Sequence, residues 1–172
     1  RGYTDFRVDP LDAAHSREVG NRYNFPGAFP ALYLAHHATL ASLEAEKDYL
    51  RLGLPFDEAC RISIPIRVSG PFLDLTSSRT RRALGVTPKM LTLPTETWKC
   101  LQAAGQEAPT QCLGRLVWES KRFGGVYFPS VESARLEDLL SSPNNLVVFM
   151  KTRKQTQPAH PLVRLELPDP QD

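Results

Sequence analysis

Two periodicities of hydrophobic and polar positions alternate along the chain. Runs typical of strands lie at 6–8, 31–35, 61–68, 72–75, 126–128, 145–150 and 162–167. Helical spacing predicts helices at about 38–51, 95–105 and 110–123, and a short helix through 81–84 that Thr76 or Ser77 caps. Strands and helices mix without a regular strand–helix–strand rhythm, so the pattern predicts an α+β domain.

Glycine and proline mark the connections between these elements. Residues 20–30, GNRYNFPGAFP, read as a loop, and Gly53 with Pro55 would end the helix at 38–51. Pro65 places the 61–68 strand at an edge or a bulge. The polar segment 151–161 reads as a surface loop before a C-terminal strand and tail. No break in composition divides the 172 residues, so we expect a single domain over 1–172.

Charge and cysteine content narrow the functional class. A net charge of +2 is too balanced for a generic nucleic-acid or membrane binder. No apolar run approaches the roughly 20 residues that span a bilayer, and the N-terminus lacks the apolar stretch of a signal peptide. Cys60, Cys100 and Cys112 are odd in number and widely spaced, which favours reduced, partly buried thiols and a cytoplasmic location.

Four residues are the first candidates for chemistry: Arg7, Arg22, Tyr33 and Glu44. Two guanidinium groups could clamp a diphosphate, and the Tyr33 ring could stack on a flat heteroaromatic group. Helical geometry puts Glu44 at the rim of the apolar stripe, where a carboxylate can face a cleft. The structural alternative is a solvated glutamate, a surface arginine and a core tyrosine, and periodicity alone does not exclude it.

Ser130 has a functional and a structural interpretation, and the His36-His37 pair raises the question of a metal site. Ser130 could donate to a phosphate or ribose oxygen, or could end a strand and cap a helix. No Gly-x-Ser-x-Gly elbow surrounds it. Neighbouring histidines on a strand point to opposite faces, so we expect no metal site there.

The ordered set of motifs resembles the RES-domain family, toxins encoded beside antitoxins of the Xre type. The matching segments, in chain order, are Phe6-Arg7-Val8, Gly20-x-Arg22-Tyr23-Asn24-x-Pro26-Gly27, Tyr33-Leu34-Ala35, Glu44, Leu73-Asp74-Leu75-Thr76, Arg82 and Gly85, Thr110-Gln111, Gly124 to Ser130, and Asn145 to Phe149. The resemblance covers roughly residues 5–150. Tyr23 replaces a more usual Trp or Phe, and Asn21 a frequent Gly.

The resemblance implies a mixed β core flanked by helices, similar to ADP-ribosyltransferases, and NAD⁺ as substrate without a permanently bound cofactor. Glu44 would stabilise the positive charge that develops on the ribose as nicotinamide leaves. Tyr33 would stack on nicotinamide or ribose. The diphosphate and ribose would be held by Arg7, Arg22 and Ser130, with Asn24 and Gln111 in support.

The acceptor stays open at this point. Water would make the protein an NAD⁺ glycohydrolase, inorganic phosphate as co-substrate a phosphorylase, and a protein side chain an ADP-ribosyltransferase toxin. A non-catalytic binding module is a further alternative, which the intact Arg, Tyr, Glu and Ser set disfavours. The resemblance also implies a helix-turn-helix antitoxin of the Xre type as partner and leaves room for a homodimer within their complex. We expect no direct contact with nucleic acid or membrane.

Overall fold

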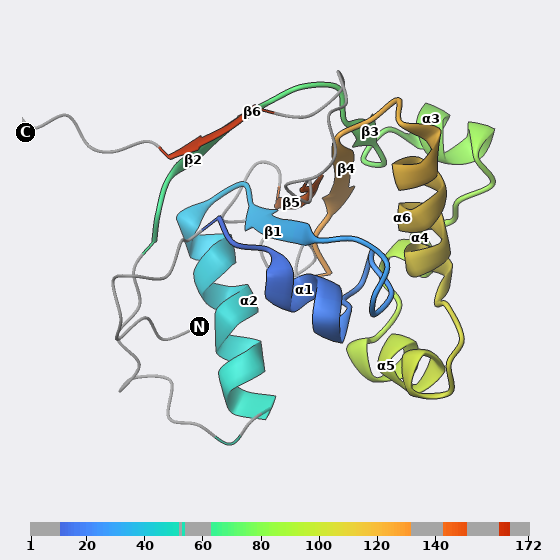
Figure 1. The fold of residues 1–172 in the computed structure, drawn as a ribbon, viewed down its shortest axis with the longest axis horizontal. Coiled ribbons are helices and arrows are strands. Elements are labelled where there is room, and N and C mark those ends of the chain that lie inside the picture. Colours follow the sequence, from blue (N-terminus) through green and yellow to red (C-terminus); the bar gives the residue numbers. More distant parts are fainter. Residues whose placement is uncertain (1–10, 52, 54–62, 132–142, 151–161, 166–172) are drawn as a thin grey trace, which may run out of the picture.

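Figure 1 shows the fold of the protein in a computed structural model. The structure describes residues 11–51, 53, 63–131, 143–150 and 162–165. The expected strand at 6–8 with Arg7, the 151–161 loop, Pro55 and Cys60 lie outside these residues.

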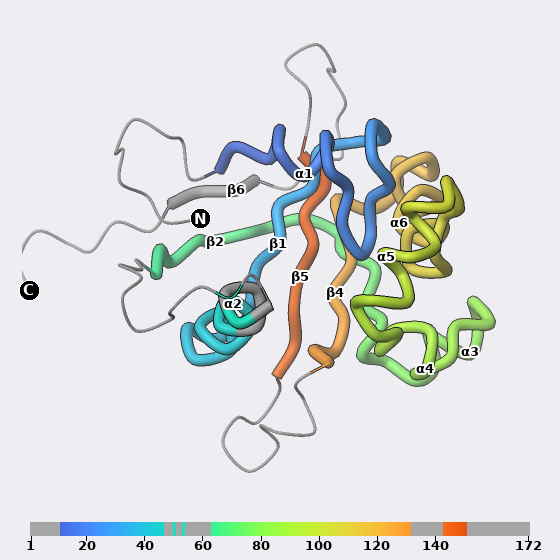
Figure 2. The backbone as a smooth tube through the Cα atoms, turned by 90° about the horizontal axis from the view of Figure 1, so that it is seen from below, coloured from blue at the N-terminus to red at the C-terminus, as the bar shows by residue number. Residues whose placement is uncertain are grey.

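A mixed sheet forms the centre of the described part. Its strands are β1 (Ala31–Ala35), β5 (Asn144–Phe149), β4 (Gly125–Pro129) and β3 (Leu73–Asp74), in that spatial order. β5 runs antiparallel to both β1 and β4, and β3 runs parallel to β4. Figure 2 shows β5 between β1 and β4. Strands from both ends of the chain therefore meet in one sheet.

A second, antiparallel pair joins β2 (Ile66–Ser69) to β6 (Leu162–Leu165). The strand predicted over 61–68 starts later than expected. Residues 63–65 are irregular, and β2 begins directly after Pro65. Proline has no N–H to give to a ladder, so it precedes the pairing instead of lying within it.

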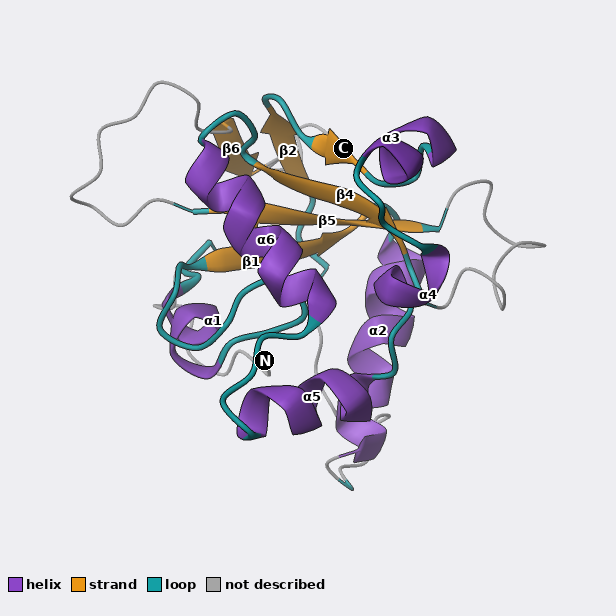
Figure 3. Ribbon diagram, turned by 90° about the vertical axis from the view of Figure 1, so that its right-hand side faces the viewer, coloured by secondary structure: helices purple, strands orange, loops and turns teal. Residues whose placement is uncertain are grey.

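Helices surround the central sheet. They are α1 (Ala14–Val19), α2 (Ala38–Arg51), α3 (Ser78–Ala83), α4 (Pro88–Leu91), α5 (Thr95–Ala103) and α6 (Pro109–Ser120). Figure 3 shows α6 crossing the sheet region, with α1, α2 and α5 on the side away from β2 and β6. This arrangement confirms the α+β prediction.

Most predicted elements are present, with shifted ends. The strand at 31–35 and the helix at 38–51 are confirmed with their predicted bounds, and Ser77 is the residue that caps α3, accepting from the Thr80 N–H at 3.4 Å. α6 ends before the predicted Phe123, because Lys121 takes a left-handed φ of 56°. α1 and α4 were not predicted, because they are too short to show a helical period.

Aromatic side chains dominate the core between α6 and the sheet. Phe29 stacks on Trp118 with ring centroids 4.9 Å apart and meets Phe149 edge-on. The Tyr23 ring lies 4.5 Å from that of Phe128. Two of these rings, Tyr23 and Phe29, come from the 20–30 loop, so this loop is anchored in the core.

The two cysteines that the structure describes are both free thiols. Cys100 is exposed and Cys112 is half-buried, so the prediction of partial burial is wrong for Cys100.

No helix in the described part of the chain has the length and apolar character needed to cross a membrane.

Candidate ligand pocket around Glu44

A pocket of about 880 Å³ lies beside the central sheet, within the size range of small-molecule sites. Its lining comes from four parts of the fold: the α1 region and 20–30 loop, strands β1, β4 and β5, helix α2, and helix α5. Figure 2 shows α2 on the β1 side of the sheet and α5 on the β4 side. The pocket therefore joins segments that are far apart in sequence.

Strand register explains which sheet residues reach the pocket. Asn145 of β5 lies opposite Ala35 of β1 and Phe128 of β4. Opposite residues in antiparallel strands share a face, as do residues two apart in one strand. Tyr33 shares that face with Ala35, and all of these side chains line the pocket. The alternation of each strand thus turns a polar amide and a phenol toward the same space.

Glu44 enters this space from α2. Ala41, three residues before it, and the adjacent Ala45 also line the pocket wall, and their small side chains leave room around the carboxylate. Glu44 Oε1 accepts hydrogen bonds from Ser130 Oγ at 2.6 Å and from Asn145 Nδ2 at 3.1 Å. The structure assigns no hydrogen bond from the described residues to Oε2. The carboxylate is thus held through one oxygen while the other can accept from a ligand.

Ser130 is buried, and its hydroxyl is directed to Glu44. It lies two residues beyond Phe128, on the same face of the β4 segment, which brings it to the Glu44 carboxylate. The sequence predicted a hydroxyl for a phosphate or ribose oxygen. In the structure this hydroxyl orients the carboxylate.

Tyr33 is fixed at its phenolic oxygen. The hydroxyl donates to Asn24 Oδ1 at 2.8 Å and accepts from the Tyr23 backbone N–H at 2.9 Å. Burial raises the pKa of the Tyr33 phenol above its usual range, so it stays neutral at physiological pH. The ring therefore presents a rigid, uncharged surface to the pocket.

Arg22 lines the pocket and also binds the chain that leads to α5. Its Nη1 donates to the carbonyl oxygens of Leu91 at 3.1 Å and Leu93 at 2.9 Å. Burial lowers the pKa of the guanidinium, an effect that nearby Glu44 opposes, but an arginine keeps its charge at neutral pH. Arg22 thus contributes positive charge and anchors the α4–α5 connection.

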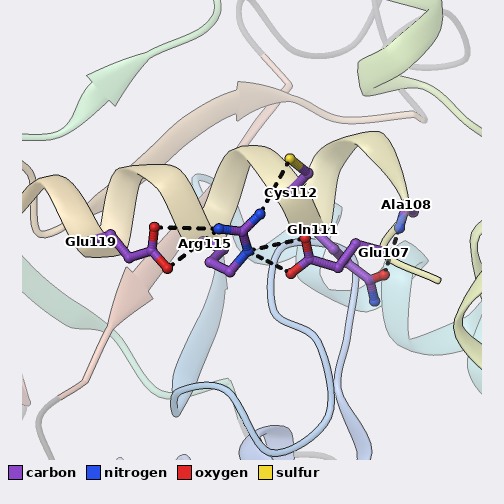
Figure 4. Close-up of polar contacts among 6 residues, drawn as sticks. All are labelled: Glu107, Ala108, Gln111, Cys112, Arg115 and Glu119. Carbon is purple, nitrogen blue, oxygen red and sulfur yellow. Dashed lines mark hydrogen bonds and ion pairs between the residues drawn. The ribbon is translucent and has the colours of Figure 1, made fainter. Parts of the chain in front are cut away.

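Asn24 and Gln111 lie behind the pocket lining and are fully buried. Asn24 Nδ2 donates to the carbonyls of Ser16 and Phe29, while Gln111 Nε2 donates to Asn21 O and Gln102 Oε1. Figure 4 shows the side-chain oxygen of Gln111 accepting from the Ala108 N–H at the start of α6. These amides hold the 20–30 loop and α6 in place, so any effect on a ligand is indirect.

Gly114 allows α6 to approach this loop closely. A Cβ at Gly114 would overlap the carbonyl oxygen of Tyr23, a fixed backbone atom. A side chain at this position would push apart the helix and the loop that carries Arg22.

The histidine pair lies next to β1. His36 and His37 form a bend after the strand and their rings are 4.7 Å apart, so the expectation that they point to opposite faces of a strand is wrong. Within the described ranges no group of three His, Cys, Asp or Glu residues could hold a metal ion. Arg7 lies outside the described residues.

Sequence reasoning missed two contributions to the pocket. Asn145 belongs to a predicted strand, but its contact with Glu44 depends on the pairing of β5 with β1 and β4. α5 was predicted as a helix, but no pocket-lining role was predicted for it. Residues 95, 98, 99, 102 and 103 line the pocket at helical spacing, and this periodicity was a signal available in the sequence.

Fold and pocket together define an α+β protein with a polar, ligand-sized pocket beside its mixed sheet. The model of the RES domain family matches residues 2–166, so the chain belongs to this family. The match extends beyond the 5–150 segment that carried the resemblance.

Comparison with solved structures supports the same fold. A chain in the crystal structure of the M. tuberculosis MbcT–MbcA toxin–antitoxin complex superposes with a TM-score of 0.64. The alignment has 23% sequence identity and covers 95% of this chain and 78% of that one. No curated protein gives a significant sequence match.

Proposed function

We propose that this protein is a toxin that cleaves the nicotinamide–ribose bond of NAD⁺. The observation that carries the proposal is the Glu44 carboxylate, which Ser130 and Asn145 hold through one oxygen at the wall of a pocket of about 880 Å³. Membership in the RES domain family and a fold shared with a chain of a toxin–antitoxin complex support it.

The chemistry requires a fixed negative charge more than a strong acid. The bond between ribose C1′ and the nicotinamide nitrogen breaks, and its electron pair stays on the nitrogen, so nicotinamide leaves as a neutral molecule. Positive charge develops on the ribose, and a preorganised carboxylate stabilises it. Glu44 fits this role, because its position is set before the ligand binds. Its second oxygen is suited to accept from a ribose hydroxyl.

The remaining pocket residues divide between binding and positioning. Tyr33 would stack on nicotinamide or ribose, and Arg22 with Arg7 would bind the diphosphate. Ser130 and Asn145 orient Glu44. Asn24 and Gln111 would support the loop that carries Arg22.

Either of two acceptors, water or inorganic phosphate, can then form a bond to ribose C1′. Water adds its oxygen to C1′ and loses a proton, which yields ADP-ribose. Inorganic phosphate adds an oxygen to the same carbon and yields a phosphorylated ADP-ribose. We propose NAD⁺ depletion by one of these routes, with activity held in check by a helix-turn-helix antitoxin of the Xre type.

The test is incubation of purified protein with NAD⁺, with and without phosphate, followed by product identification. We expect free nicotinamide without any acceptor protein. Glu44→Gln should slow its release by about 10²- to 10³-fold, the usual loss of a preorganised electrostatic contact. Glu46→Gln, on the same helix but outside the pocket lining, is the matched control. Label found on a protein with little free product would instead indicate an ADP-ribosyltransferase.

A further inference from the structure

One wall of the pocket has no role in the reaction described above. It is the face of α5 formed by Thr95, Trp98, Lys99, Gln102 and Ala103. Figure 2 shows α5 on the β4 side of the sheet and α2 on the β1 side, so the two helices bound different parts of the pocket. A ligand that contacts both helices would extend away from the reacting carboxylate.

Charge is distributed unevenly over the pocket lining. Among the lining residues that the structure describes, Glu44 is the only one with a carboxylate, while Arg22 and Lys99 supply positive charge. The Arg22 Nη1 atom is already bound to two backbone carbonyls. No carboxylate of the described ranges forms an ion pair with the half-buried Lys99, whose ammonium lies 5.7 Å from the centre of the Trp98 ring. Lys99 is thus a cation available to an anionic ligand.

Trp98 adds a second, independent observation. It lines the pocket and is only 5% exposed, and its indole Nε1–H has no acceptor among the residues that the structure describes. The indole nitrogen is itself buried, so the Trp98 ring, and not its N–H donor, borders the pocket. A ring beside the Lys99 ammonium keeps water from that side of the charge, which strengthens its attraction to a phosphate oxygen.

We propose that the α5 face is an anion subsite that binds the diphosphate of the dinucleotide together with Arg22, with Lys99 as its cation beside the Trp98 ring. This inference rests on the proposed function, because it assumes that a dinucleotide occupies the pocket. It also sets the direction of the ligand. The cationic nicotinamide ribose lies at Glu44, and the diphosphate extends toward α5, where the charge is positive.

Binding of ADP-ribose, measured by calorimetry, tests the subsite without requiring turnover. Lys99→Gln should weaken binding about tenfold or more, as expected for the loss of a charge-assisted hydrogen bond, and Lys99→Arg should stay within about threefold of the wild type. Lys89→Gln, at an exposed position of α4, is the matched control and should bind as the wild type does.

A phosphate-free probe separates a binding role from a structural one. Affinity for nicotinamide riboside should be the same in Lys99→Gln and wild type, since the proposed contact is with phosphate. Wild-type affinity of Lys99→Gln for ADP-ribose, or an equal loss for both probes, would overturn the subsite.

The two proposals fail in different ways. Lys99-dependent binding of ADP-ribose without nicotinamide release from NAD⁺ would remove the proposed function and leave the subsite. Nicotinamide release with an unchanged KM for NAD⁺ in Lys99→Gln would remove the subsite and leave the proposed function. A wild-type protein that binds neither ADP-ribose nor NAD⁺ would refute both.

Discussion

At the scale of single residues, the arrangement around Glu44 is asymmetric. Ser130 Oγ and Asn145 Nδ2 both donate to the same oxygen, Oε1. Hydrogen bonds to a charged acceptor are stronger than neutral ones, so two of them restrict the carboxylate to one orientation. This preorganisation is what electrostatic stabilisation of a developing charge requires, because no reorientation has to accompany the reaction.

Removal of one of these donors should lower the rate more than it lowers substrate binding. We expect Asn145→Ala to reduce kcat for nicotinamide release about tenfold, with KM changed little, because one of two charge-assisted bonds is lost. The neighbouring Asn144 donates to the Tyr127 hydroxyl at 3.1 Å instead. Asn144→Ala is therefore the control. Equal losses of kcat in both variants would show that Asn145 acts only through strand stability.

At the scale of elements, the 20–30 loop is held from several sides. Gln111 Nε2 binds Asn21 O, the Gly27 N–H binds Arg17 O, and Tyr23 and Phe29 enter the core. A glycine- and proline-rich loop is thereby made part of the folded core. A rigid loop suits a binding site, because side chains such as Arg22 are positioned before the ligand arrives.

Close packing of α6 against this loop predicts a marked effect of a single methyl group. Gly114→Ala should destabilise the protein by about 1–3 kcal/mol, as overpacking against backbone usually does. Thermal or denaturant unfolding measures the change. Leu116→Ala, at an exposed position of the same helix, is the control and should have a small effect. Wild-type stability of Gly114→Ala would mean that α6 and the loop can separate without cost.

The bonds from Arg22 to the α4–α5 connection predict coupling between the loop and α5. Arg22→Lys keeps the charge but cannot reproduce the planar guanidinium that binds both Leu91 O and Leu93 O. We expect faster hydrogen exchange of α5 amides in this variant. Arg17→Lys, at an exposed position in α1, should leave α5 protection unchanged. Unaltered α5 exchange in Arg22→Lys would contradict the anchoring role.

At the scale of the whole molecule, two buried phenols link folding to alkaline pH. Burial raises the pKa of Tyr23 and of Tyr33 above the ordinary value of 10. Below pH 10 both phenols are protonated in the folded and unfolded states, so their contribution to stability is complete there. Above pH 10 the unfolded chain loses these protons first, and the folded state is progressively destabilised.

Ultraviolet titration of tyrosine ionisation checks this prediction. The folded protein should show two fewer ionisations near pH 10–11 than the denatured protein, and the missing ones should appear together with unfolding. Tyr33→Phe should remove one of them. If all five tyrosines of the chain ionised near pH 10 while the fold remained intact, the two phenols would not be buried.

Local patterns in the sequence determined the element types and several site residues. Leu40 and Leu43 at helical spacing are sufficient to define α2 and to place Glu44 at the rim of its apolar stripe, because helical geometry is set within a few residues. Leu50 has the same spacing but is exposed, so the stripe does not extend to the end of the helix. The Tyr33 strand follows from a short apolar run in the same way. The ordered motifs identified the family, which the match over residues 2–166 confirms.

Only the tertiary structure decided how these residues act together. Ser130 and Asn145 lie 86 and 101 residues from Glu44 in sequence, and strand pairing brings both to one carboxylate oxygen. The same holds for Arg22, whose carbonyl partners lie 69 and 71 residues away. Periodicity reports which face of its own element a side chain occupies. Which faces meet depends on the register and packing of distant segments, and no local pattern contains that information.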